Sequence, residues 1–336
     1  MNEPASLPDL AEVSRPDATA FAEIRKAGRP VVIRGLVREW PAVAAGLQGG
    51  EAAVDYLRRF TPSRPVKAIA AAPSEKGRFF YTPDLTHLNF ISGSGQLGQF
   101  LSDLLEAARD PDPPALAVQS EPVAEILPGF AEANRLGLLP GVGARIWIGN
   151  AIRVAPHLDV KENIACCMAG RRTFTLFPPE QIGNLYPGPF ELTPAGTPVS
   201  MVDPDNADLE RFPRFADAWA SARRTTLEPG DAIYIPYCWW HAVRSHDPVS
   251  ILVNYWWYDA LPGIGAPYDA LLHAIWAWRG LPPAQRAVWR SMLDHYVFEA
   301  NGDPGSHLPE PVRGVLGRPE PGLFARIREI LRSTLR

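Results

Sequence analysis

The chain has 336 residues, 46% of them hydrophobic and 21% charged, so it is long enough to bury a full core. Its formal net charge of -4 gives no overall basic surface, which argues against a protein that binds nucleic acids or anionic membranes. No stretch of about 18 apolar residues occurs, so no membrane span is expected.

The cysteines and the N-terminal residues indicate a compartment. Cys166, Cys167 and Cys238 show no C-x-x-C spacing, and an odd number of cysteines does not form a disulfide framework. The first residues contain acids and prolines, whereas a signal peptide has a basic start and an apolar run. We therefore expect a cytoplasmic protein that is neither exported nor inserted into a membrane.

The first part of the chain mixes helix and strand patterns. Residues 1–16 predict a flexible lead-in, and residues 17–120 predict an α/β region. Within it, apolar residues at helical spacing predict helices over 17–28, 49–60 and 96–110. A β-branched run between a proline and a glycine predicts a strand within 29–37.

The second part changes from strands to helices. Residues 121–261 contain short β-branched and aromatic runs broken by proline and glycine, which predict a β core. A polar, proline-rich loop over 191–215 interrupts this core, and such loops commonly cover a site or a surface. Helical patterns dominate residues 262–336, which therefore predict a C-terminal helical region.

Two histidines and one aspartate are candidate metal ligands. His157 and Asp159 are two positions apart, so on a strand their side chains would point to the same face. His241 ends a second alternating stretch, and a closed antiparallel fold could bring it to the same point. Two histidines and one carboxylate on one side of a metal form the facial triad of non-heme Fe(II) oxygenases. The alternatives are a surface His-x-Asp pair and a core histidine packed beside Trp239 and Trp240.

Several motifs occur together and in a fixed order: RPVVIRGLV and WPA within residues 29–42, GRFFY at 77–81, IWIGN, PHLDVKENIACCMAGRRTFTLFPPEQIGNLYPGP, PGDAIYIPYCWWHAV, and ILVNYWW. In this combination the sequence resembles the cupin-like branch of the JmjC family, of the asparaginyl-hydroxylase type. The resemblance covers residues 29–257. It implies a double-stranded β-helix of the cupin or jelly-roll type, with N-terminal α/β elements and a C-terminal helical region.

The resemblance also implies a cofactor and a co-substrate. His157, Asp159 and His241 match the positions of the Fe(II) ligands in the family. Residues expected around the co-substrate 2-oxoglutarate are Arg172, Asn163, Asn254, Tyr81 and Trp256. The two asparagines could instead satisfy strand ends, and Trp256 could belong to the core.

Two positions depart from the family pattern. Arg172 stands where this branch has the lysine that binds the distal carboxylate of 2-oxoglutarate. The change keeps the positive charge but replaces a compact ammonium by a planar fork of donors. A turn at Ala169–Gly170 must reorient the chain for Arg172 to point inward, and Lys161 is the other nearby cation. At the second position, Val154 replaces a threonine that binds the co-substrate.

The expected function is that of an Fe(II)- and 2-oxoglutarate-dependent dioxygenase that hydroxylates a protein side chain or a small molecule. The alternative is a non-catalytic cupin-like protein that senses a metal or a ligand, and the acidic balance gives little support to an RNA-modifying oxygenase. The apolar stripes of the C-terminal helices predict a homodimer. These helices could instead cover the flank of the β core.

Overall fold

The computed structural model describes residues 7–60, 62 and 64–334. The chain forms two compact units, Met1–Tyr258 and Asp259–Arg336, and each is described by itself. The first unit therefore ends at Tyr258, whereas the sequence suggested that the helical region begins at residue 262. No helix in the described residues is both long and apolar enough to cross a membrane.

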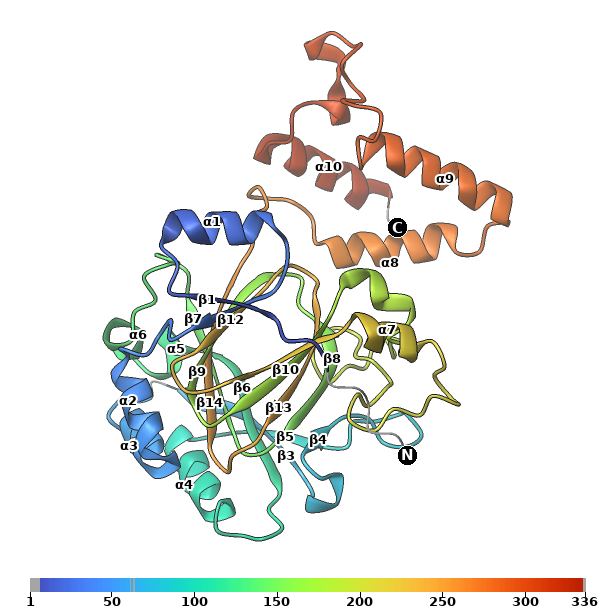
Figure 1. The fold of residues 1–336 in the computed structure, drawn as a ribbon. Helices are drawn as coiled ribbons and strands as arrows, with labels where there is room; N and C mark the ends of the chain where they lie inside the picture. The colour runs from blue at the N-terminus through green and yellow to red at the C-terminus, as the bar shows by residue number, and fades with distance from the viewer. Residues whose placement is uncertain (1–6, 61, 63, 335–336) are drawn as a thin grey trace. The chain divides into compact units, whose positions relative to one another are not determined.

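The first unit is built on two β-sheets (Figure 1). The larger sheet has nine strands in the order β1-β2-β12-β9-β14-β7-β6-β3-β5, and the smaller has five in the order β11-β10-β13-β8-β4. The strands are β1 (Ala11–Ser14), β2 (Val31–Arg34), β3 (Val66–Ala71), β4 (Arg78–Phe79), β5 (Ile91–Gly95), β6 (Ala115–Pro122), β7 (Ala144–Gly149), β8 (Arg153–Leu158), β9 (Glu162–Ala169), β10 (Arg172–Phe177), β11 (Arg223–Leu227), β12 (Ala232–Ile235), β13 (Trp240–Ser245) and β14 (Ser250–Trp257).

From β7 onward the chain passes repeatedly from one sheet to the other. Strands β7, β9, β12 and β14 belong to the nine-stranded sheet, and β8, β10, β11 and β13 belong to the five-stranded sheet. The pairings among these strands are antiparallel. The jelly-roll fold predicted from the sequence is thus confirmed, and its two sheets enclose the space in which the site lies.

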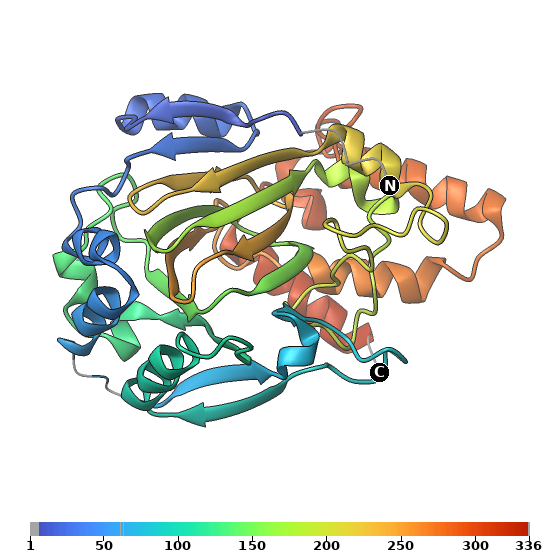
Figure 2. The same ribbon diagram turned by 60° about the horizontal axis from the view of Figure 1, so that its bottom comes forward.

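Helices cover the outer face of the nine-stranded sheet (Figure 2). The helices of the first unit are α1 (Ala18–Lys26), α2 (Pro41–Gln48), α3 (Gly50–Arg58), α4 (Leu97–Ala107), α5 (Val123–Ile126), α6 (Phe130–Ala133) and α7 (Phe215–Ser221). Two 3-10 turns lie at Pro73–Glu75 and Pro179–Gly183. The helices predicted over 17–28, 49–60 and 96–110 are confirmed as α1, α3 and α4.

Strand β9 shows why an almost continuous apolar run forms a strand here. Ile164, Cys166 and Met168 pack in the cluster shared with the helices, whereas Ala165 and Cys167 pack in the cluster between the sheets. Successive side chains of a strand point to opposite faces, so both faces of β9 are covered and neither needs polar residues.

One sequence prediction at the N-terminus is partly wrong. Ala11–Ser14 do not form a flexible lead-in but the edge strand β1, which pairs in parallel with β2. Of these four residues, Val13 packs against the core, and one apolar residue is too weak a pattern to predict a strand. Residues 1–6 of the predicted lead-in lie outside the described residues.

The second unit contains α8 (Pro267–Trp278), α9 (Pro283–Tyr296) and α10 (Pro321–Thr334), with 3-10 turns at Glu310–Val312 and Gly314–Leu316. Neither α8 nor α9 contains a buried residue. Large apolar side chains are exposed on both helices, and Trp276 is 72% exposed. The helical region predicted from the sequence is present, and large apolar side chains of α8 and α9 are exposed within this unit.

We predict that Gly46→Ala destabilises the first unit. A Cβ at Gly46 would lie 2.1 Å from the carbonyl oxygen of Met168, because α2 packs directly on β9. Forcing an atom into a packed contact typically costs about 1–3 kcal/mol. Urea unfolding should show this loss. Gly98→Ala on α4, where a Cβ meets no atom within 4 Å, is the control and should not lower stability. Equal stability of the two variants would contradict the prediction.

Candidate metal centre

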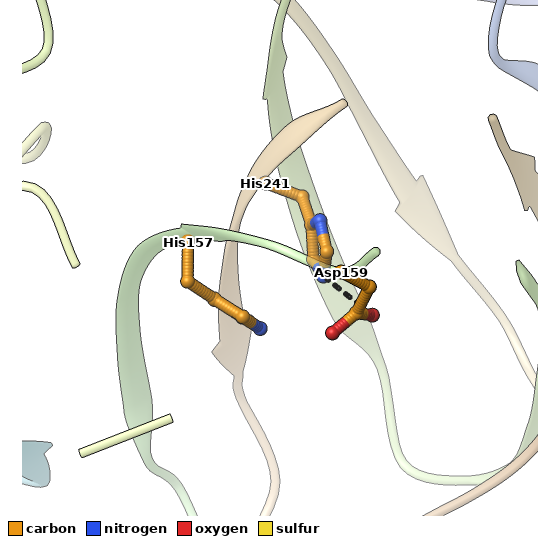
Figure 3. A group of neighbouring side chains, drawn as sticks. All are labelled: His157, Asp159 and His241. Carbon is orange, nitrogen blue, oxygen red and sulfur yellow. Dashed lines mark ion pairs between the residues drawn. The ribbon is translucent and has the colours of Figure 1, made fainter. Parts of the chain in front are cut away.

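Neighbouring strands of the five-stranded sheet bring the three predicted metal ligands together (Figure 3). His157 lies on β8 and His241 on β13, and the two residues face each other directly in the antiparallel register. Asp159 follows the end of β8. The register shifts between His241 and Val243, and such bulges often occur next to functional sites.

The geometry of the three side chains suits one metal ion. Their candidate ligand atoms all lie within 4.8 Å of one another. The Nε2 atom of His241 is 3.7 Å from Oδ2 of Asp159, and the two imidazole rings are 4.3 Å apart between centroids. No other group of three histidine, cysteine or acidic residues with this spacing occurs in the described part of the chain.

Backbone carbonyls orient both histidine rings. The Nδ1 atom of His157 is 3.0 Å from the carbonyl oxygen of Ala155, and Nδ1 of His241 is 3.0 Å from that of Trp239. A neutral imidazole that donates through Nδ1 keeps the lone pair of Nε2 for a metal. Burial and the neighbouring His157 lower the pKa of His241, so at neutral pH this ring is uncharged, as a metal ligand must be.

A cavity of about 380 Å³ opens beside the three ligands, between the two sheets. All three residues line it, together with most of the residues that the sequence assigned to the co-substrate. Pro194 and Ala195 of the long loop also line it, so the loop predicted over 191–215 does cover the site. Asp159 and Arg172 are the charged groups on its described wall.

Arg172 points into this cavity and is 5% exposed. Its Nε donates to Oγ of Ser250 at 2.8 Å, and its Nη2 donates to the carbonyl oxygen of the same residue at 3.3 Å. Among the described residues no carboxylate forms an ion pair with Arg172. Burial lowers the pKa of its guanidinium to about 10, so the group remains charged at neutral pH. The cavity therefore contains a buried cation that pairs with no described carboxylate.

A turn between the two sheets gives Arg172 this direction. β9 ends at Ala169 in one sheet, and β10 begins at Arg172 in the other. Gly170 has φ 70°, and a Cβ there would lie 2.6 Å from the carbonyl oxygen of Val249, so only glycine fits. Arg171 points to the surface, where it pairs with Asp247 at 3.2 Å. The reorientation at Ala169–Gly170 that Arg172 requires is present.

Three side chains form a hydrogen-bonded series along the wall of the nine-stranded sheet. Nε1 of Trp147 donates to Oδ1 of Asn254 at 2.9 Å, and Nδ2 of Asn254 donates to Oδ1 of Asn163 at 3.2 Å. Asn163, Asn254 and Trp256 all line the cavity, and their place near a co-substrate stays a prediction. The asparagines thus bond to each other and face the cavity.

Tyr81 is a correction to the sequence prediction. It does not line this cavity; its hydroxyl donates to the carbonyl oxygen of Leu192 at 3.0 Å, and its ring packs against Phe80. Tyr81 thus supports the loop that covers the site and does not face this cavity. Lys161 does not line the cavity either; it is exposed, with its Nζ 5.8 Å from the ring of Trp256.

The sequence did not predict two residues that orient side chains of the wall. Trp147 orients Asn254, and Ser250 orients Arg172. The motif IWIGN, which contains Trp147, contributed to the family resemblance and could have pointed to this residue. No signal in the sequence identifies Ser250, because its role depends on how β14 lies beside the turn after β9.

Comparison with known proteins identifies the family. The sequence model of the cupin-like domain matches residues 17–261. The chain belongs to this family. Relatives of this cupin-like protein carry JmjC names, which confirms the branch of the family predicted from the sequence.

Three relatives illustrate the range of similarity. The Jumonji C domain-containing protein 5 of Drosophila melanogaster is 27% identical over 255 residues, which are 74% of this chain and 60% of the relative. The human bifunctional peptidase and (3S)-lysyl hydroxylase JMJD7 is 28% identical over 287 residues, 75% of this chain and 84% of that protein. The lysine-specific demethylase JMJ31 of Arabidopsis thaliana is 32% identical over 131 residues, 39% of this chain and 22% of the relative.

We predict that His157→Ala and Asp159→Ala each abolish measurable binding of Fe(II) or of its redox-stable substitute Mn(II), since a triad has no spare ligand. The loss should exceed the roughly 10- to 100-fold effect of removing an outer partner of a ligand. Anaerobic calorimetry measures it, and circular dichroism checks that the fold is retained. His246→Ala is the control, because His246 bonds Thr173 outside the triad. Unchanged affinity in both triad variants would contradict the assignment.

Proposed function

We propose that this cupin-like protein is an Fe(II)- and 2-oxoglutarate-dependent oxygenase that hydroxylates its acceptor. The observation that supports this most directly is the combination, in one cavity, of a His-Asp-His triad and a buried arginine that pairs with no described carboxylate. A structural metal site would need neither the cavity nor the buried cation. The curated names of relatives include a hydroxylase and a demethylase, which agrees with oxygenase chemistry.

The side chains fit the proposed iron and co-substrate. The Nε2 atoms of His157 and His241 and a carboxylate oxygen of Asp159 would hold iron and leave other coordination positions open. A buried cation without a partner carries a large desolvation cost, which a bound carboxylate offsets. The distal carboxylate of 2-oxoglutarate is such an anion, and a guanidinium can grip it with two parallel donors. Arg172 is held by Ser250, so its fork is already oriented.

The side chains of the protein would position the reactants and exclude water from the metal. When bound, iron and 2-oxoglutarate supply the oxidation: the acceptor C–H and O2 become C–OH, while 2-oxoglutarate becomes succinate and CO2. Asn163 and Asn254 fix the polar part of the wall, and Phe174 and Leu252 line its apolar part. Pro194 and Ala195 cover the cavity, which limits the access of water to the metal.

Slow turnover without an acceptor separates an oxygenase from a non-catalytic sensor. Purified protein with Fe(II), 2-oxoglutarate and O2 should release succinate slowly, and the Asp159→Ala variant should release none above the metal-only background. A sensor would bind Fe(II) and 2-oxoglutarate in calorimetry but form no succinate under any tested condition. That result would overturn the proposed activity.

We predict that Arg172→Ala raises the dissociation constant for 2-oxoglutarate without changing the affinity for the metal. A charge-assisted hydrogen bond contributes about 1.5–3 kcal/mol, which corresponds to about 10- to 150-fold in affinity. Arg172→Lys tests whether bidentate hydrogen bonding to the carboxylate is essential, since a lysine keeps the charge but not the pair of parallel donors. Calorimetry with Mn(II) present measures all three proteins.

Two further variants serve as controls for Arg172. Arg171→Ala should leave the affinity for 2-oxoglutarate nearly unchanged, because Arg171 pairs with Asp247 at the surface. Lys161→Ala tests the other cation that the sequence offers near the site. Equal affinity of the wild type and Arg172→Ala would show that the co-substrate does not bind where we place it.

We also propose that the protein forms a homodimer through its C-terminal helices. Helices α8 and α9 expose large apolar side chains, including Leu272 and Trp276. Exposed apolar stripes of this size usually mark an interface. We predict that the full chain sediments as a dimer, and that the double variant Leu272→Asp/Trp276→Asp sediments as a monomer. Arg279→Asp, an exposed change on the same segment, should remain dimeric, and a monomeric wild type would refute the proposal.

A further inference from the structure

Strand β14 runs from the buried end of the cavity to its more exposed end. Every second side chain of this strand points to the space between the sheets, namely those of Ser250, Leu252, Asn254 and Trp256. Ser250 accepts a hydrogen bond from Arg172. A strand rises about 3.3 Å per residue, so the six steps from Ser250 to Trp256 span about 20 Å. The Arg172 end is buried, whereas Trp256 and Trp147 are half-exposed. If 2-oxoglutarate lies between Arg172 and the metal, the acceptor must approach from the Trp256 end.

Two cations flank Trp256 at this open end. The guanidinium carbon of Arg145 lies 5.7 Å from the centroid of the Trp256 ring, and Nζ of Lys161 lies 5.8 Å from it. Arg145 also donates from Nε to Oγ of Ser120 at 2.7 Å, and Ser120 lines the cavity. Within the described residues, neither Arg145 nor Lys161 has a carboxylate at ion-pair distance.

The acids near this end are already engaged. Asp159 is the only carboxylate on the described wall of the cavity, and it belongs to the metal triad. Glu162, next to Lys161 in the sequence, accepts a hydrogen bond from the hydroxyl of Tyr234 at 2.6 Å. Glu121, next to Ser120, pairs with Arg64 at 2.7 Å. No described carboxylate therefore remains in the cavity to neutralise a cationic acceptor.

We infer that the acceptor carries an anionic group, a carboxylate or a phosphate, which Arg145 and Lys161 receive beside Trp256 while an uncharged part reaches the metal. This inference rests on the proposed oxygenase function and names the chemical class of its acceptor. It also separates the chain from a relative named for lysyl hydroxylation, whose acceptor residue is a cation. Like charges at the entrance disfavour a cationic side chain, and opposite charges favour an anionic one.

Binding of defined probes to the full chain tests the inference. The probes are two fluorescein-labelled octapeptides, alternating Gly-Glu and alternating Gly-Lys, and unlabelled N-acetylglutamate as a small competitor. Mn(II) replaces Fe(II), and saturating 2-oxoglutarate occupies Arg172, so that the anionic probes can report only on the open end. Fluorescence anisotropy should give an affinity for the acidic peptide about 10-fold or more above that for the basic peptide. The difference should shrink as salt is added.

Charge reversal with a matched control locates the effect. Arg145→Glu/Lys161→Glu should abolish or invert the preference. Lys26→Glu/Arg109→Glu changes the net charge by the same amount at exposed positions away from the cavity lining and should keep it. Lys161→Glu alone decides the matter if the double variant does not fold, because Lys161 is exposed and makes no structural hydrogen bond among the described residues.

Each outcome has one meaning. Binding of the acidic peptide supports a polypeptide acceptor, and binding of N-acetylglutamate without the peptide supports a small acidic acceptor. Equal or tighter binding of the basic peptide, no binding of either anionic probe, or an equal loss in the control variant would overturn the inference. Failure of the proposed function is distinguished by direct titration of 2-oxoglutarate: without its binding the oxygenase proposal fails, whatever the probes do at the open end.

Discussion

The register between β8 and β13 is the constraint on which the site depends. His157 and His241 are separated by 84 residues in the sequence but lie directly opposite each other in this pair of strands. A slip of one residue would turn every side chain of one strand to the other face of the sheet. One histidine would then point away from the inner space and the triad would be lost. The bulge after His241 and the backbone bonds to both rings fix the pairing and the direction of the imidazoles.

The space between the sheets is polar only where the site requires it. Most side chains that meet there are apolar or small, and they include Ala165, Cys167, Phe174 and Leu252. A buried guanidinium in such surroundings is unfavourable for the unliganded protein, even with two hydrogen bonds to Ser250. A fold that needed only stability would be better served by an apolar residue at Arg172. The position is thus understandable as part of a binding site and not as part of the core.

Short-range patterns in the sequence predicted the helices and the metal ligands that depend on the spacing of neighbouring residues. The spacing of His157 and Asp159, the alternation before His241 and the apolar periodicity of α1, α3 and α4 are visible in short windows. Tyr81 and β1 could not be assigned in this way. Tyr81 ends the matched motif GRFFY, but the path of the 191–215 loop decides which carbonyl its hydroxyl meets. β1 forms because β2 offers it an edge, which is a property of the assembled sheet. The direction of the Arg172 side chain follows from the turn at Gly170, where the chain crosses from one sheet to the other. A short window of sequence shows the glycine but not this crossing.

The two departures from the family pattern both lie on the wall of the cavity. Val154 lines the cavity and offers no hydroxyl, at the position where the family resemblance implies a threonine. A lysine has three donors on a flexible stem, whereas arginine has five in a rigid plane. Arg172 uses Nε and Nη2 to bind Ser250, which fixes that plane and leaves the Nη1 side of the fork for a ligand. Arg172 can therefore bind Ser250 through Nε and Nη2 and still present donors to an anion. A lysine at this position has a single ammonium group, which would have to share its donors between Ser250 and the anion. The positive charge is thus kept at Arg172 and its plane is fixed by Ser250, although Val154 supplies no hydroxyl to the same wall.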